Sequence, residues 1–260
     1  MRSILVQAGN DRCCPARIET AMAVARAASG HVTVLIDTPI EPYVSTNPYG
    51  GTFVAKDALE AAIKADDELA RTLESRLGAG DVQFDVVKTE GSPLDAMLSA
   101  AKLADLAIVS RSCGFAGDLA IEANCPVLVL GTAALAVPVS TAVIAWDGGL
   151  QGARALRGAV PLLAGCSAVH VVSVSNSEES EFPATNSLRY LARHGITAEL
   201  HELRKSGSVE ATIAAEVARL GASLLVMGAY SHTRLREFMF GGVTRYFLDL
   251  AAGPALLLAH

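Results

Sequence analysis

Glycines and small polar residues near the C-terminus have the types and spacing of an anion-binding loop. The apolar run Leu224–Met227 is followed by Gly228-Ala229-Tyr230-Ser231, and nine residues separate Ser231 from Gly241-Gly242-Val243-Thr244. This pattern predicts a buried strand, a glycine-flanked loop and a helix N-terminus, where free backbone N–H groups and the helix dipole attract phosphate. The pattern alone is weak, because glycines between a strand and a helix are more often turn residues.

The charged and aromatic residues around this loop allow two interpretations each. His232, Arg234 and Arg236 face a phosphate or form a solvated surface with Glu237. Arg245 opposes the helix dipole, so it lies beside an anion or pairs with a carboxylate. The apolar segment 238–240 is expected to pack on a neighbouring domain or on a second chain.

Catalytic chemistry has little support in the sequence. No Gly-x-Ser-x-Gly elbow, Gly-x4-Gly-Lys-Ser/Thr loop or His-Glu-x2-His helix occurs, and no Lys lies in the glycine-flanked loop. His170, His194 and His201 are scattered along the chain, and we interpret them as unrelated residues. We therefore predict no catalytic residue and no metal centre.

The elements that must position the loop form a pattern that occurs twice. We expect strands at 4–6, 31–36, 82–87, 106–109 and 127–130, and again at 142–147, 168–174, 197–203, 224–227 and 255–258, with helices between them. The sequences also correspond: Ala104–Ser110 matches Ala222–Gly228, and Cys125–Leu130 matches Gly253–Leu258. Such self-similarity indicates a tandem duplication, which predicts one domain over 1–132 and another over 141–260.

Alternating strands and helices predict parallel sheets covered by helices on both faces. Ser92 and Ser208 are expected to cap helices, and the proline-containing segment Thr38–Thr52 is expected to be a long loop. In an open parallel sheet a ligand binds beyond the carboxyl ends of the strands, where the strand order reverses. The anion-binding loop has room in one half only, because Ser110 and Cys125 are 15 positions apart, whereas Gly228 and Gly253 are 25 apart.

The composition of the chain limits the classes of molecule that it is expected to bind. The net charge of -6 argues against a general nucleic-acid surface, although a local pocket for a small anion is compatible with it. No apolar run approaches the roughly 18 residues of a membrane span, and no signal peptide is visible, so we expect a cytoplasmic protein.

The five cysteines form no Cys-x2-Cys pair. Cys113, Cys125 and Cys166 are expected to be apolar fillers, and Cys13-Cys14 either a loop residue beside a buried one or a redox pair.

A duplicated five-stranded α/β unit with Asp147 at the end of its first strand and a Gly-x2-Gly-x9-Gly-Ser/Thr-like loop after its fourth resembles the universal stress protein family. The resemblance covers essentially the whole chain as a tandem pair of domains. It implies two Rossmann-like domains, each a five-stranded parallel sheet of order 3-2-1-4-5 with helices on both faces. It also implies a role in the stress response and, in members of the ATP-binding type, adenine beside the first-strand Asp and phosphates on the loop.

Carried onto this chain, the resemblance implies that ATP, or AMP or ADP, binds in the C-terminal half. The implied binding residues are Asp147, Met227, Gly228, Tyr230, Ser231, Gly241, Gly242, Val243 and Thr244. The loop departs from the family pattern at two of these: Ser231 replaces a glycine that allows close approach of a phosphate, and Gly242 replaces a hydroxyl-bearing residue. Thr244 offers a hydroxyl nearby.

The first half departs further from the family pattern. Gly9 occupies the position of the first-strand Asp, and the loop Ser110–Gly117 is truncated. We expect no nucleotide there and interpret this half as a structural partner, with the chain forming a homodimer or a pseudo-dimer within itself.

Two other functions compete with nucleotide binding. One is an interaction module without nucleotide that acts through dimerisation or partner binding. The other is an enzyme of the wider adenine-nucleotide α-hydrolase group, which the sequence disfavours because no Ser-Gly-Gly-x-Asp-Ser motif occurs. Any hydrolysis of bound ATP is expected to be slow and incidental.

Overall fold

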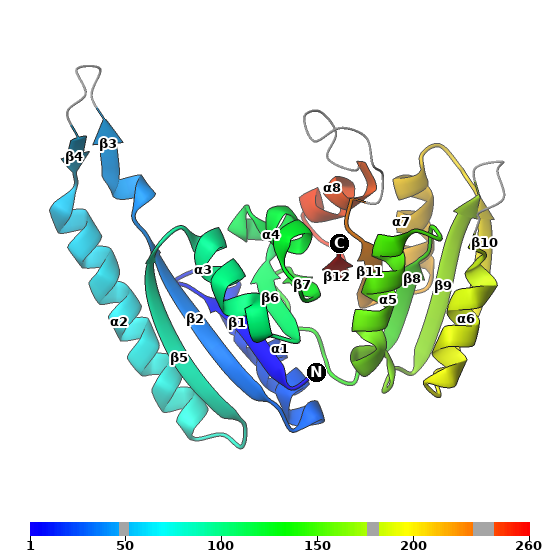
Figure 1. Ribbon diagram of the computed structural model, residues 1–260, viewed down its shortest axis with the longest axis horizontal. Helices are drawn as coiled ribbons and strands as arrows, with labels where there is room; N and C mark the ends of the chain where they lie inside the picture. Colours follow the sequence, from blue (N-terminus) through cyan, green and yellow to red (C-terminus); the bar gives the residue numbers. More distant parts are fainter. Residues whose placement is uncertain (47–51, 176–181, 231–241) are drawn as a thin grey trace.

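The computed structural model describes residues 1–46, 52–175, 182–230 and 242–260 of the chain (Figure 1). Ten strands form one continuous sheet in the order β10-β9-β8-β11-β12-β7-β6-β1-β2-β5. The strands are β1 (Ser3–Ala8), β2 (His31–Pro39), β5 (Gln83–Gly91), β6 (Leu106–Ser110), β7 (Val127–Leu130), β8 (Thr141–Ala145), β9 (Ala168–Ser175), β10 (Glu199–Arg204), β11 (Leu224–Gly228) and β12 (Ala255–Ala259).

Each half contributes five strands in the order 3-2-1-4-5, which confirms the expected topology. These are β5-β2-β1-β6-β7 in the N-terminal half and β10-β9-β8-β11-β12 in the C-terminal half. Pairing within each half is parallel. The halves meet through an antiparallel pair, β12 with β7, in which Leu257 lies opposite Leu128. The last strands of the two repeats thereby join the two units into one sheet.

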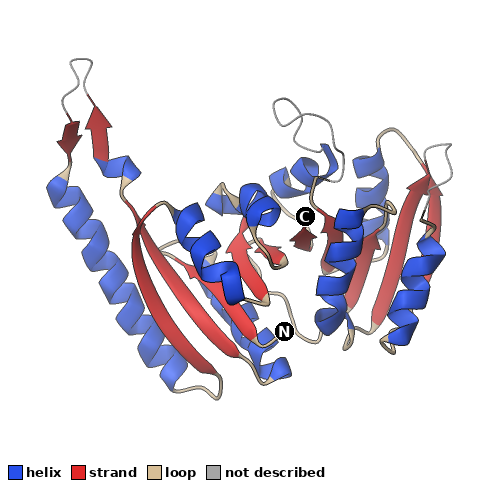
Figure 2. Ribbon diagram, in the orientation of Figure 1, coloured by secondary structure: helices blue, strands red, loops and turns tan. Residues whose placement is uncertain are grey.

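Helices cover both faces of this sheet, as Figure 2 shows by secondary structure. The helices are α1 (Cys14–Ala28), α2 (Lys56–Gly78), α3 (Pro93–Ala100), α4 (Ala116–Glu122), α5 (Leu150–Leu163), α6 (Ala184–Arg193), α7 (Val209–Arg219) and α8 (Gly242–Asp249). Apolar residues of α1, α2, α5 and α6 pack on one face, and those of α3, α4, α7 and α8 on the other. Strands such as β6 and β12 are buried along their whole length, which explains their uninterrupted apolar sequences.

Two predicted helix caps are confirmed. The hydroxyl of Ser92 accepts a hydrogen bond from the backbone N–H of Asp95, and that of Ser208 accepts one from Ala211. The last helix ends at Asp249, earlier than the periodicity of its apolar residues predicted. Short 3₁₀ turns lie at Glu41–Tyr43, Ala101–Leu103 and Arg111–Cys113.

The prediction of a loop over Thr38–Thr52 was wrong in part. Strand β2 continues to Pro39, and β3 (Val44–Thr46) pairs with β4 (Thr52–Val54) as an antiparallel hairpin above α2 (Figure 1). Val44, Phe53 and Val54 have the β-branched and aromatic side chains that strands favour, whereas Pro39, Pro42 and Pro48 dominated the sequence pattern. In the described ranges, no helix combines the length and apolar character of a membrane span.

Candidate functional site

The carboxyl ends of β8 and β11 lie side by side in the C-terminal half, because Met227 pairs with Ala145 in the parallel register. Both strands end here, with Asp147 two residues beyond β8 and Gly228 as the last residue of β11. The neighbouring strands β9 and β12 lie on opposite sides of this pair, so the strand order reverses at this point. This is the edge at which a parallel sheet binds its ligands.

Gly228 allows the first turn of α5 to approach the end of β11. A Cβ atom at this position would lie 2.6 Å from the backbone nitrogen of Gly152 and 2.8 Å from the carbonyl carbon of Gln151. Such distances are below any van der Waals contact, so only glycine fits without a shift of the helix. The absence of side chains at Gly228 and Gly152 therefore brings backbone of strand and helix together at this edge.

Asp147 is exposed and lies over the start of α5. Its Oδ1 accepts a hydrogen bond of 2.9 Å from the backbone N–H of Gly149, and a Cβ on Gly152 would lie 2.8 Å from the same oxygen. The carboxylate thus stabilises the turn before the helix, and its negative charge interacts favourably with the positive end of the helix dipole. Because Asp147 is exposed, its second carboxylate oxygen is accessible to solvent.

Tyr230 and Thr244 connect the two ends of the glycine-flanked loop. The backbone N–H of Tyr230 donates to Thr244 Oγ1 over 3.2 Å, and the Thr244 side chain is buried. Tyr230 has a left-handed backbone with a φ of 55°, which is uncommon for a residue with a side chain. Met227 is buried, Val243 is half-buried, and Gly242 begins α8.

Part of the predicted loop lies outside the described residues. This applies to Ser231 and Gly241 among the implied binding residues, and to the segment from His232 to Phe240 with its two arginines. Arg245 lies within the described part, and its Nε is 3.4 Å from Asp249 Oδ2 one helical turn away. Of the two interpretations of Arg245, the structure shows the pair with a carboxylate.

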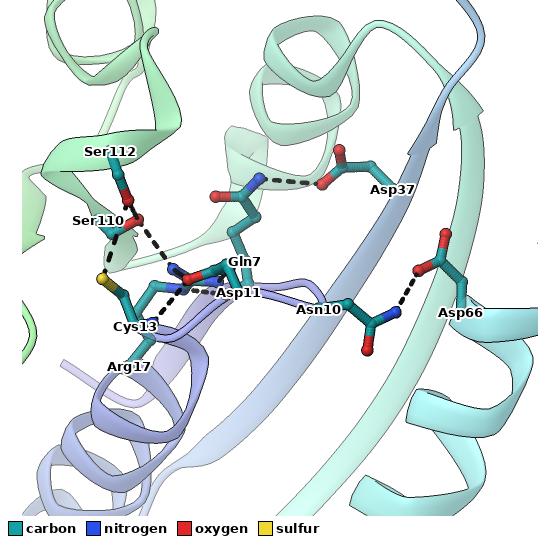
Figure 3. A network of polar contacts seen from close by, with 9 residues as sticks. All are labelled: Gln7, Asn10, Asp11, Cys13, Arg17, Asp37, Asp66, Ser110 and Ser112. Carbon is teal, nitrogen blue, oxygen red and sulfur yellow. Dashed lines mark hydrogen bonds and ion pairs between the residues drawn. The ribbon is translucent and has the colours of Figure 1, made fainter. Parts of the chain in front are cut away.

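The corresponding edge of the N-terminal half is filled by the buried side chain of Arg17 (Figure 3). Its Nε donates to the carbonyl oxygen of Gln7 at 2.7 Å, and its Nη1 to Ser110 Oγ at 2.8 Å. Nη2 lies 2.6 Å from Asp11 Oδ2. Because Gln7 is near the end of β1 and Ser110 ends β6, the guanidinium bridges the two strand ends whose counterparts are β8 and β11.

Asp11 is the anionic partner in this network. Burial raises the pKa of its carboxyl group, but the hydrogen bonds and charge of Arg17 and the backbone N–H groups of the helix start outweigh burial, so that the pKa is below its ordinary value. Our sequence interpretation missed Arg17. The signal is its position between Cys14, Ile18 and Ala21 on the apolar face of α1, where an arginine must find buried acceptors.

The expectation that the histidines are scattered was wrong for two of the three. His170 Nδ1 and His201 Nε2 are 3.0 Å apart on neighbouring strands β9 and β10, and Glu199 lies beside both. His194 does not belong to this cluster, and its ring packs against Tyr190. Parallel pairing of strands that are distant in sequence produced this cluster, and residue spacing alone does not reveal it.

The thiols fit a packing role. Burial raises the pKa values of Cys113, Cys125 and Cys166 to about 11, which keeps these thiols protonated at neutral pH. Cys13 lies in the turn before α1 and Cys14 is its first residue, and both are buried, which agrees with the interpretation of a loop residue beside a buried one. Cys14 begins α1 and packs in the core on that face of the sheet.

Residues 139–258 match the sequence model of the universal stress protein family. The C-terminal half of the chain is therefore a universal stress protein domain. Its whole fold is similar to that of a universal stress protein from Archaeoglobus fulgidus, with a TM-score of 0.75 and 12% identity over 98% of this chain and 97% of that chain. It is also similar to a Pseudomonas aeruginosa protein of unknown function, with a TM-score of 0.61 and 18% identity over 100% of this chain and 92% of that chain.

No curated protein matches the sequence of this chain. The structural similarities, at these identities, concern the fold alone. They extend over both halves of the chain.

Proposed function

We propose that the C-terminal domain binds an adenine nucleotide at the carboxyl ends of β8 and β11, and that the N-terminal domain is its structural partner. ATP is the leading ligand, with AMP and ADP as alternatives. The binding residues are those of the loop and the strand ends: Asp147, Met227, Gly228, Tyr230, Ser231, Gly241, Gly242, Val243 and Thr244. The output is binding and signalling in the stress response rather than turnover.

The contrast between the two halves carries this proposal. At the ends of β1 and β6 the guanidinium of Arg17 occupies the crevice and is held by Gln7, Asp11 and Ser110. At the ends of β8 and β11 the equivalent position of Ser110 is Gly228, which faces the backbone of Gly152 rather than a charged side chain. A ligand that approaches the first turn of α5 there meets backbone and the exposed carboxylate of Asp147.

The chemistry of these groups suits the two ends of an adenine nucleotide. The second oxygen of Asp147 is a hydrogen-bond acceptor for an amino group or a ribose hydroxyl, and backbone N–H groups at the start of α8 suit phosphate oxygens. Thr244 holds the loop ends together through Tyr230, so its hydroxyl contributes by positioning the backbone.

Calorimetric titration of the full chain with ATP, ADP and AMP tests the proposal. We expect saturable heat with at least one of the three and a matching increase in Tm. Asp147→Ala should weaken the affinity about tenfold, which corresponds to the loss of one hydrogen bond to a charged group of about 1.4 kcal/mol. Asp57→Ala, an exposed carboxylate in the first turn of α2, is the matched control and should leave the affinity unchanged.

An interaction module without nucleotide is the second candidate function. Two observations favour it: the buried hydroxyl of Thr244 already bonds within the protein, and Asp147 already caps a turn. Absence of heat and of any change in Tm at millimolar ATP would establish this candidate in place of the first. Rapid release of phosphate from ATP by the pure protein would instead contradict the assignment of a binding role.

A further inference from the structure

Two histidines and a glutamate gather at the edge of the sheet in the C-terminal half. His170 on β9 lies directly opposite Glu199 on the edge strand β10, and His201 follows two residues later. Residues two apart on a strand project from the same face, so all three side chains lie on one face of the sheet. Among the described residues, this is the one group of three His, Cys, Asp or Glu side chains with ligand atoms close enough for a metal ion.

The donor atoms have the mutual spacing of a tetrahedral coordination sphere. His170 Nδ1 and His201 Nε2 are 3.0 Å apart, and Glu199 Oε2 is 3.5 Å from the first and 3.8 Å from the second. Ligands bound tetrahedrally at 2.0–2.2 Å are separated from one another by roughly 3.3–3.6 Å. A zinc ion therefore fits between these three atoms with shifts of only a few tenths of an ångström.

A second carboxylate orients one of the histidines for this role. Glu216 on α7 is buried, and its Oε1 lies 3.1 Å from His201 Nδ1. Both oxygens of Glu216 also accept hydrogen bonds from Arg219, at 2.7 and 2.8 Å. A carboxylate that accepts the Nδ1–H of a histidine leaves Nε2 with a free lone pair, and metal-binding histidines are held in this manner.

The two imidazole rings of the cluster are largely buried, each with a side-chain exposure of 14%. The carboxylate of Glu199 is largely in solvent, with a side-chain exposure of 69%, so water has access to the remaining coordination position.

We propose that His170 Nδ1, His201 Nε2 and Glu199 form a binding site for a divalent transition-metal ion, with Zn²⁺ the best match in geometry and donor type. Imidazole nitrogens with one carboxylate oxygen suit zinc rather than Mg²⁺ or Ca²⁺, which prefer oxygen ligands alone. The ion would connect β9 to the edge strand β10. The site lies near the amino ends of these strands, whereas the proposed nucleotide site lies at the carboxyl ends of β8 and β11, so the two proposals stand independently.

Metal titration of the full chain after removal of bound ions with a chelator tests this site. We expect one Zn²⁺ per chain by calorimetry, with an affinity reduced at least about tenfold in His170→Gln, His201→Gln and Glu199→Gln. Glu216→Gln should weaken binding by about 10–100-fold, as expected for a residue that positions a ligand. His194→Gln, at the residue that follows α6, is the matched control and should bind Zn²⁺ as the wild type does.

Cobalt substitution supplies a second, independent measurement. Bound Co²⁺ should give the intense visible bands of tetrahedral coordination without thiolate charge-transfer bands. Thiolate bands, or unchanged zinc affinity in the histidine variants, would show that cysteines or another site hold the metal and would overturn the proposal. Absence of zinc binding to the wild type would overturn it as well. Circular dichroism of each metal-free variant checks folding, and the exposed Glu199 provides a variant that leaves the core untouched.

Discussion

Arg17 differs from the residues that the sequence pattern emphasised, because its importance comes from where the fold places it. Its side chain is 1% exposed and yet makes polar contacts with Gln7, Asp11 and Ser110 (Figure 3). A buried guanidinium without such partners would be costly, so these contacts keep it in the crevice. The guanidinium thereby links the ends of β1 and β6 in the N-terminal half.

Replacement of Arg17 by methionine should destabilise the protein. Asp11, the carbonyl of Gln7 and the hydroxyl of Ser110 would lose their buried partner, at a cost of about 2–4 kcal/mol after allowance for the partial exposure of Asp11. Urea denaturation measures the change in the free energy of unfolding. Arg26→Met is the matched control, because the pair of Arg26 with Asp81 is exposed and contributes far less.

This destabilisation should depend on pH with a defined sign. The folded-state pKa of Asp11 is lower than its ordinary value of 3.8, so its contribution is complete above that value and is lost as the pH falls through the folded-state pKa. The difference in the free energy of unfolding between wild type and Arg17→Met should therefore become smaller as the pH falls into the acidic range. A difference that stays constant between neutral pH and strongly acidic conditions would contradict the role of the ion pair.

At the scale of elements, the contact between β11 and α5 shapes the candidate site. Gly228→Ala places a Cβ 2.6 Å from the backbone nitrogen of Gly152, so the helix start must move. We expect a loss of about 1–3 kcal/mol in the free energy of unfolding, typical of overpacking. Gly78→Ala is the control, since nothing lies within 4 Å of a Cβ at the end of α2, and an equal loss there would contradict the steric explanation.

The same elements show which parts of the structure could be predicted from the sequence. Apolar runs and cap residues such as Ser92 and Ser208 determine local structure, so the strands and helices of both repeats were predictable. The pairing of β3 with β4 was not, because the prolines of the segment Thr38–Thr52 are typical of loops. Asp147 and Gly228 were predictable as neighbours from the rule for parallel sheets. The clusters around Arg17 and His170 were not, because they depend on side chains from separate strands and helices.

For the whole molecule, the antiparallel pair of β12 with β7 determines how the two units are arranged. Arg111, which follows β6, supports this junction by donating to the carbonyl oxygens of Leu250 and Pro254 in the other half. Two further close contacts cross it: the hydroxyl of Tyr230 approaches Gly117, and Pro126 approaches Gly158. The two units thus share one core rather than being linked by a flexible connection.

Arg111→Met should loosen this junction selectively. We expect faster hydrogen exchange of the backbone amides in β7 and β12, with little change in β2 and β9, because local opening follows the loss of local contacts. Arg154→Met is the control, since this exposed arginine donates to His260 within one half. Equal acceleration throughout the sheet would indicate a general loss of stability instead.

The pairing of β12 with β7 also determines how the two units behave when the protein is diluted. Two units that are joined covalently and share a sheet are at a fixed one-to-one ratio, and dilution does not separate them as it separates free subunits. Each unit therefore always has its partner, whatever the amount of protein in the cell. The two units can therefore differ at this edge, as identical subunits cannot: Arg17 lies between the ends of β1 and β6 in one unit, and Gly228 lies against the backbone of α5 in the other.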